Sequence, residues 1–87
     1  MSIDELRTRL EKAMPKSKVA VDDLTGTGDH FQVTIVSSEF EGLAPLERHR
    51  LVYKHIGEDV GGAIHALSIQ AYTQKQWDDR TQEIKGE

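Results

Sequence analysis

The segment His30–Ser37 has the sequence HFQVTIVS, and its alternation of apolar and polar residues predicts a β-strand. Phe31, Val33 and Ile35 would line one face of this strand, and the residues between them would line the other. A weaker, valine-rich alternation over Lys18–Asp23 predicts a second strand before it. Because the loop between the two segments is short and contains two glycines, the two strands should form a β-hairpin.

Helical patterns flank this hairpin on both sides. Ser2 and Glu5 form a capping-box pair before an apolar stripe that ends at Pro15. After the hairpin, Pro45 is suited to the first position of a second helix, which glycines from Gly57 onward would end. The first stripe contains Ile3, Leu6, Leu10, Ala13 and Met14, and the second contains Leu46, His49, Val52, Tyr53 and Ile56.

A third strand and a third helix complete the predicted fold. Ile64–Tyr72 is β-branched and apolar, and the capping pair Thr73 and Gln76 opens a last helix that runs through Trp77, with a polar tail from about residue 85. The predicted order is α-β-β-α-β-α. Since a lone hairpin is only marginally stable, the three strands should share one sheet with the helices packed on it. The sequence therefore predicts a single α+β domain over residues 1–87.

The composition narrows the range of functions. The 87 residues contain no cysteine, so disulfides, thiolate nucleophiles and sulfur-based zinc sites are excluded. The net charge of −4 opposes binding to nucleic acid, which usually requires a basic excess. No long apolar run or signal-like N-terminus is present, so we expect a cytoplasmic protein that does not enter a membrane.

The four histidines are the side chains best suited to metal or proton chemistry near neutral pH. His49 and His55 are six residues apart in one predicted helix, so they face different directions and cannot chelate one metal. His30 and His65 each stand at the start of a strand, where a half-buried structural histidine is more common than a ligand. No set of residues builds a plausible active site, and the sequence predicts a binding module and not an enzyme.

Several short segments, in this order and spacing, resemble the BolA family over nearly the whole chain. They are Gly28–Val33, Phe40–Gly42, Arg48–Val52 and Ile64–Ile69, followed by Tyr72, Thr73 and Trp77. One departure is Gln74, where relatives commonly carry proline at the first position of the last helix. The resemblance implies a fold similar to the class II KH domain, which agrees with the predicted order of elements.

The resemblance also implies a partner and a cofactor. BolA-like proteins pair with monothiol glutaredoxins of the CGFS type and share a 2Fe-2S cluster with the glutaredoxin and glutathione. The implied ligand in this chain is His65, and the implied second ligand, from the loop between the first two strands, is best matched by His30. Imidazoles can replace two thiolates on one iron, as they do in Rieske centres. The expected function is a non-enzymatic adaptor in iron–sulfur cluster trafficking or in iron and redox regulation, and the isolated domain should be monomeric.

Two other functions remain open. The KH-like fold, with Arg48, Arg50 and Lys54, suggests a nucleic-acid-binding transcriptional regulator. Against it stand the negative charge and the lack of the Gly-x-x-Gly clamp of KH domains, and residues 47–50 are expected to form a solvated helix face. A stress or cell-shape factor that acts only through protein contacts is the third possibility.

Overall fold

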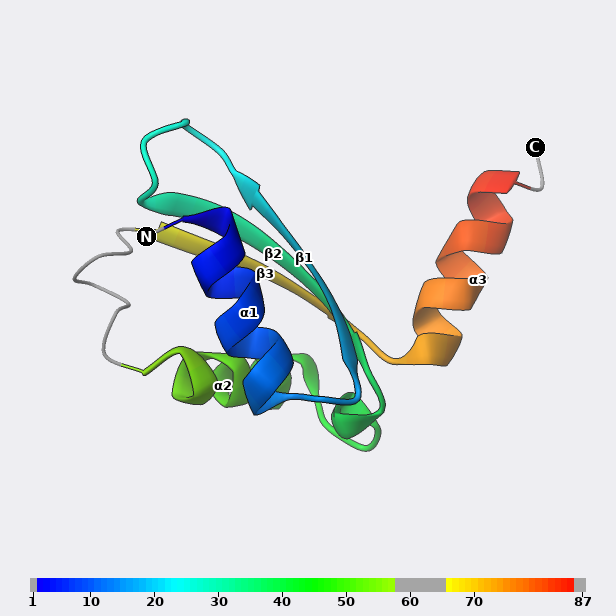
Figure 1. Ribbon diagram of the computed structural model, residues 1–87. Helices are drawn as coiled ribbons and strands as arrows, with labels where there is room; N and C mark the ends of the chain where they lie inside the picture. The colour runs from blue at the N-terminus through cyan, green and yellow to red at the C-terminus, as the bar shows by residue number, and fades with distance from the viewer. Residues whose placement is uncertain (1, 58–65, 86–87) are drawn as a thin grey trace.

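The computed structural model describes residues 2–57 and 66–85, with the backbone alone for residues 66 and 82–85. The order of elements predicted from the sequence is confirmed, with one added turn of 3-10 helix, η1, before the second helix (Figure 1). The elements are α1 (Ile3–Ala13), β1 (Ser17–Asp23), β2 (His30–Ser37), η1 (Ser38–Phe40), α2 (Pro45–Ile56), β3 (Ala66–Tyr72) and α3 (Gln74–Lys85). Ile64 and His65, which the sequence assigns to the start of the third strand, lie outside the described residues.

The sheet is mixed, with the strand order β1-β2-β3. β1 and β2 form the predicted antiparallel hairpin, whereas β2 and β3 run parallel. Parallel neighbours need a crossover connection, and α2 lies in the segment that makes it. In this register His30 pairs with Ala66, the first residue of β3. The amino ends of β2 and β3 therefore meet at one end of the sheet, where the β1–β2 loop also lies.

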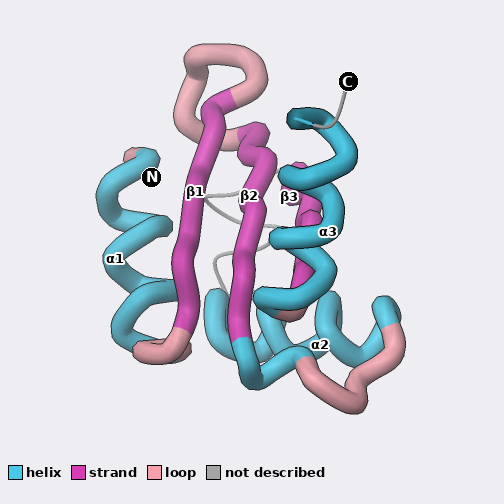
Figure 2. The backbone as a smooth tube through the Cα atoms, turned by 90° about the vertical axis from the view of Figure 1, so that its right-hand side faces the viewer, coloured by secondary structure: helices cyan, strands magenta, loops and turns pink. Residues whose placement is uncertain are grey.

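The helices lie on both faces of the sheet. α1 and α2 lie together on one face, and α3 stands on the opposite side (Figure 1). In the view turned by 90°, α3 lies in front of the strands, next to β2 and β3 (Figure 2). The core is the layer of buried side chains between the sheet and the first two helices, with η1 closing one end. Its members are Leu6, Leu10, Met14, Val21, Phe31, Val33, Ile35, Phe40, Val52, Ile56 and Ile69.

The predicted helix starts are seen in hydrogen bonds between capping side chains and backbone amides. The Ser2 hydroxyl accepts from the amide of Glu5 at 3.1 Å at the start of α1. At the start of α3 the capping box is complete, because the Thr73 hydroxyl accepts from the Gln76 amide and the Gln76 side-chain oxygen accepts from the Thr73 amide. α3 therefore begins at Gln74, and glutamine at this position is compatible with a capped helix start.

The packed face of α2 differs from the apolar stripe predicted for it. Val52 and Ile56 are buried as expected, but Leu46 is 60% exposed and Tyr53 is 39% exposed. The helix instead turns Arg48 toward the core. A stripe counted from hydrophobicity misses this rotation, because a pattern of that kind treats arginine as a surface residue.

Candidate functional site

The β1–β2 loop is organised around one carboxylate. Oδ1 of Asp23 accepts hydrogen bonds from the amides of Thr25 and Gly26 at 3.3 and 2.9 Å, and Oδ2 accepts from the amide of Gly28 at 2.9 Å. Gly26 and Gly28 have φ angles of +75° and +77°, which side-chain-bearing residues rarely adopt. The loop thus has a defined shape, set by three amides that converge on Asp23.

His30 stands where this loop enters β2, and its ring is tied to the residue before it. Nδ1 of His30 lies 2.8 Å from Oδ1 of Asp29. The hydroxyl of Thr27 donates to the same carboxylate oxygen and is itself in contact with the hydroxyl of Thr25. The side chains of His30 and Asp29 are 40% and 30% exposed, so the pair lies at the surface without being fully solvated. This exposure agrees with the half-buried position expected for a histidine at the start of a strand.

The second predicted ligand, His65, lies outside the described residues. The residue that follows it in the sequence, Ala66, is the register partner of His30 in the parallel pair of β2 and β3. The described structure therefore brings the start of β3 beside His30. The prediction that the two histidines form one site stays a prediction.

The described residues could provide only part of the ligand set of a metal centre. Within residues 2–57 and 66–85 no three histidine, aspartate or glutamate side chains are grouped closely enough to hold a metal ion together. A 2Fe-2S cluster needs four protein or thiol ligands, so the described residues could supply no more than two of them at one place. A histidine whose second ring nitrogen bonds to a carboxylate is the usual arrangement of a metal-binding histidine. His30 with Asp29 fits that pattern.

Arg48, one of the residues proposed for nucleic-acid contact, is occupied inside the protein. It is only 9% exposed, and its guanidinium lies 5.9 Å from the centre of the Phe40 ring. Nε donates to the carbonyl of Leu43 at 2.9 Å, while a terminal nitrogen donates to the carbonyl of Ala71 at 3.2 Å and to Oε1 of Gln76 at 2.7 Å. The expectation of a solvated face at this position is wrong, because acceptors from three separate segments meet at the guanidinium.

The other two basic candidates, Arg50 and Lys54, are exposed on α2. With Arg48 buried, the three residues do not form one basic surface. The nucleic-acid interpretation therefore depends on two exposed cations in a chain whose net charge is −4.

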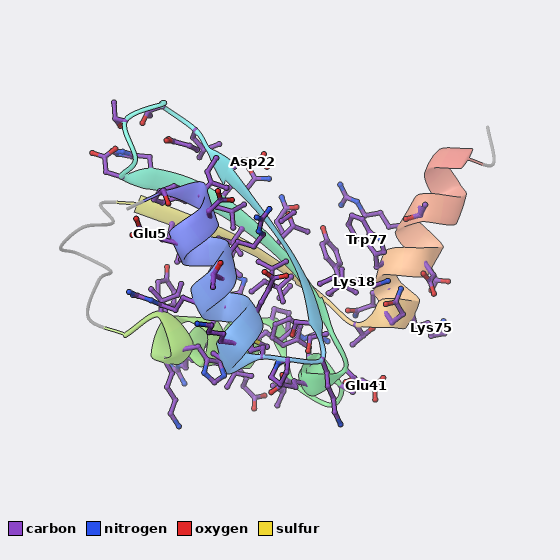
Figure 3. All side chains as sticks on the ribbon, in the orientation of Figure 1. Glu5, Lys18, Asp22, Glu41, Lys75 and Trp77 are labelled. Carbon is purple, nitrogen blue, oxygen red and sulfur yellow. The ribbon has the colours of Figure 1, made fainter. Side chains whose placement is uncertain are left out.

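A shallow groove that the sequence did not predict lies between the sheet and α3. Its volume is about 180 Å³, and Trp77 closes one side of it. Figure 3 shows Trp77 on the side of α3 that faces the sheet, with Lys18 nearby. The strand residues along the groove are Lys18, Val19, Ala20, Thr34 and Val36. These side chains are polar, small or aliphatic, and they hold no cluster of groups suited to catalysis.

None of the helices in the described part of the chain is both long and apolar enough to cross a lipid bilayer.

The family model for BolA-like proteins matches residues 4–76. BolA-like protein 1 of Homo sapiens is 43% identical, and the match covers 88% of this chain and 61% of that protein. The chain thus spans about three fifths of the length of this relative.

Two further similarities agree with this match. The protein called DNA-binding transcriptional regulator BolA in Vibrio cholerae is 45% identical over 58 residues, which cover 67% of this chain and 55% of the relative. The solution structure of BolA1 from Mus musculus superimposes with a TM-score of 0.77 at 38% identity, covering 92% of this chain and 71% of the mouse chain. The order of elements, the mixed three-stranded sheet and these matches lead to one assignment: the chain belongs to the BolA family.

Proposed function

We propose that this protein is a non-enzymatic adaptor of the cytoplasm that binds a CGFS-type monothiol glutaredoxin and co-ligates a shared 2Fe-2S cluster. His30 and His65 would be its ligands, and the glutaredoxin and glutathione would supply thiolates. The adaptor would act in cluster trafficking or in iron and redox regulation. When bound, the cluster would supply the redox and ligand-exchange chemistry, while this chain would contribute imidazole donors and a docking surface.

One observation carries this proposal, namely the geometry at the amino ends of β2 and β3. His30 begins β2, and its register partner Ala66 directly follows His65 in the sequence. The carboxylate of Asp29 holds Nδ1 of His30, as carboxylates commonly do for metal-binding histidines. The absence of cysteine from the sequence leaves imidazole as the donor best suited to iron. Membership of the BolA family adds the expectation of a glutaredoxin partner.

Anaerobic reconstitution of the complex tests the proposal. The full chain, a CGFS glutaredoxin, glutathione, iron and sulfide would be combined, and the cluster followed by visible absorption and circular dichroism. We expect His30→Ala and His65→Ala each to change the visible spectrum or to shorten the lifetime of the cluster. The matched control is His49→Ala, because His49 lies on α2, away from the loop.

Spectra for His30→Ala and His65→Ala that both equal that of the parent would show that this chain does not ligate the cluster. A complex that never forms, judged by size-exclusion chromatography of the mixed proteins, would exclude the adaptor function itself. The isolated chain, which we expect to elute as a monomer, gives the reference for this measurement.

The alternative function is transcriptional regulation through nucleic-acid binding. The observation that favours it is the similarity to the Vibrio cholerae protein named as a DNA-binding transcriptional regulator. Arg50 and Lys54 are the exposed candidates for phosphate contact. Duplex DNA binding that weakens steeply with salt, and weakens further in Arg50→Ala and Lys54→Ala, would support it. No binding at low salt would exclude it.

A further inference from the structure

We propose that Asp29 is a positioning residue that holds the His30 ring with its proton on Nδ1, so that Nε2 is the nitrogen offered to a metal. The inference rests on the proposed function for its metal, but its first test needs none.

The direction of the hydrogen bond fixes the tautomer. An ionised carboxylate can only accept, so the Nδ1 atom that lies 2.8 Å from Oδ1 of Asp29 has to carry the proton. In neutral imidazole the lone pair is then on Nε2, the nitrogen that points away from the carboxylate. A histidine that bound metal through Nδ1 would have to break this contact.

The contact between Asp29 and His30 depends on the conformation of the loop and not on the geometry of the strand. Side chains of successive residues in a strand point to opposite faces, so Asp29 and His30 would separate if both were extended in β2. Asp29 instead precedes the first residue of β2 and lies in the bend of the loop. The backbone conformation of the loop therefore decides whether the carboxylate reaches Nδ1.

Two further interactions hold the carboxylate in place. The hydroxyl of Thr27 donates to the same Oδ1 that accepts from His30, so this oxygen is bound from two directions. The three amides that converge on Asp23 fix the loop one step earlier in the chain. The His30 ring is thus oriented from its own strand on one side and from the ordered loop on the other.

An orienting carboxylate has two consequences for a ligand. It reduces the rotational freedom that the imidazole loses when it binds, and it makes the ligating nitrogen more electron-rich. Loss of such a partner typically lowers metal affinity by about 10- to 100-fold. Asp29 would therefore affect the cluster without touching it.

The first test uses the protein without metal. Long-range proton–nitrogen correlation spectra of isotope-labelled protein report which ring nitrogen of each histidine carries the proton. We expect His30 to be mainly the Nδ1–H form in the parent and in Asp29→Asn, whose amide oxygen can still accept. In Asp29→Ala we expect a shift toward the Nε2–H form, whereas Asp22→Ala should match the parent.

A parent His30 that is mainly Nε2–H, or an Asp29→Ala spectrum equal to that of the parent, overturns the inference. Backbone correlation spectra of each variant show that the fold is retained, so an altered tautomer would not reflect unfolding.

The second test uses the complex with a CGFS glutaredoxin, glutathione and cluster. We expect Asp29→Ala to shorten the cluster lifetime roughly tenfold or more and to shift the reduction potential to a more positive value, with partial recovery in Asp29→Asn. If His30→Ala changes the cluster and Asp29→Ala does not, the positioning role is wrong while the ligand assignment stands. If His30→Ala changes nothing, the ligand assignment is wrong, and the metal-free spectra alone decide whether Asp29 orients the ring.

Discussion

Replacing Arg48 with alanine is expected to lower the free energy of unfolding by about 4 kcal/mol. Arg48 is 9% exposed, and its guanidinium makes hydrogen bonds to acceptors on three segments, two of which lie more than 20 residues away in the sequence. It joins the carbonyl of Leu43, ahead of α2, to the carbonyl of Ala71 in β3 and to the side chain of Gln76 in α3.

The magnitude follows from two contributions. The hydrogen bonds to Leu43, Ala71 and Gln76 contribute about 1 kcal/mol each, which together gives about 3 kcal/mol. The aliphatic stem of Arg48 loses its burial as well, at up to about 0.8 kcal/mol for each methylene. Because small domains unfold at about 5–15 kcal/mol, a loss of this size would leave the variant marginally stable.

Urea denaturation followed by far-UV circular dichroism and tryptophan fluorescence measures the change. Arg50→Ala is the matched control, since Arg50 lies on the same helix and is exposed. We expect it to stay within about 0.5 kcal/mol of the parent. Arg48→Met keeps much of the stem but no donor, so it should fall between the parent and Arg48→Ala.

Equal stability of Arg48→Ala and Arg50→Ala would refute the reasoning, because it would mean that the buried hydrogen bonds add nothing over solvation by water. A dependence on urea concentration that changes strongly between variants would need a different explanation, since it reports a change in the exposed surface and not in contacts alone.

Three further predictions concern the ends of the sheet and α3. Gln76→Glu should stabilise the fold by about 0.5–1 kcal/mol, because a carboxylate keeps the cap of α3 and adds a charge-assisted bond to Arg48; urea titration that finds a loss would contradict this. Asp23→Ala should cost about 1–2 kcal/mol and speed hydrogen exchange at the loop amides that it binds, whereas the exposed neighbour Asp22 tolerates alanine. Trp77→Ala should speed exchange of the α3 amides while the core amides keep their protection, since this side chain lines the groove between helix and sheet; uniform loss of protection would show that α3 is part of the core.

Much of the fold could be predicted from local patterns. The alternation over His30–Ser37 gave the bounds of β2 without error, and β1 begins one residue earlier than predicted. Pro15 and the capping pair of Thr73 and Gln76 marked helix ends correctly, because these signals act through backbone groups within a few residues. Such features depend on residues that are close together in the sequence, so the sequence alone can predict them.

The parts that could not be predicted depend on groups that are far apart in the chain. Burial of Arg48 requires carbonyls from two other segments and the side-chain oxygen of Gln76 to converge on it, and no pattern on α2 reports them. The orientation of α2 that turns Arg48 toward the core also leaves Leu46 exposed. The pairing of His30 with Ala66 likewise depends on the register of two parallel strands.

Arg48 and His30 lie near opposite ends of the sheet, and the register of β3 gives the distance between them. Arg48 binds the carbonyl of Ala71, whereas His30 pairs with Ala66, five residues earlier in β3. At about 3.3 Å per residue, the two positions are separated by roughly 16 Å along the strand. Effects of substitutions that far apart, without shared partners, are usually additive. Arg48 variants should therefore change stability without altering the tautomer of His30, and Asp29 variants should do the reverse, which separates a loss of cluster caused by unfolding from one caused by a misplaced ligand.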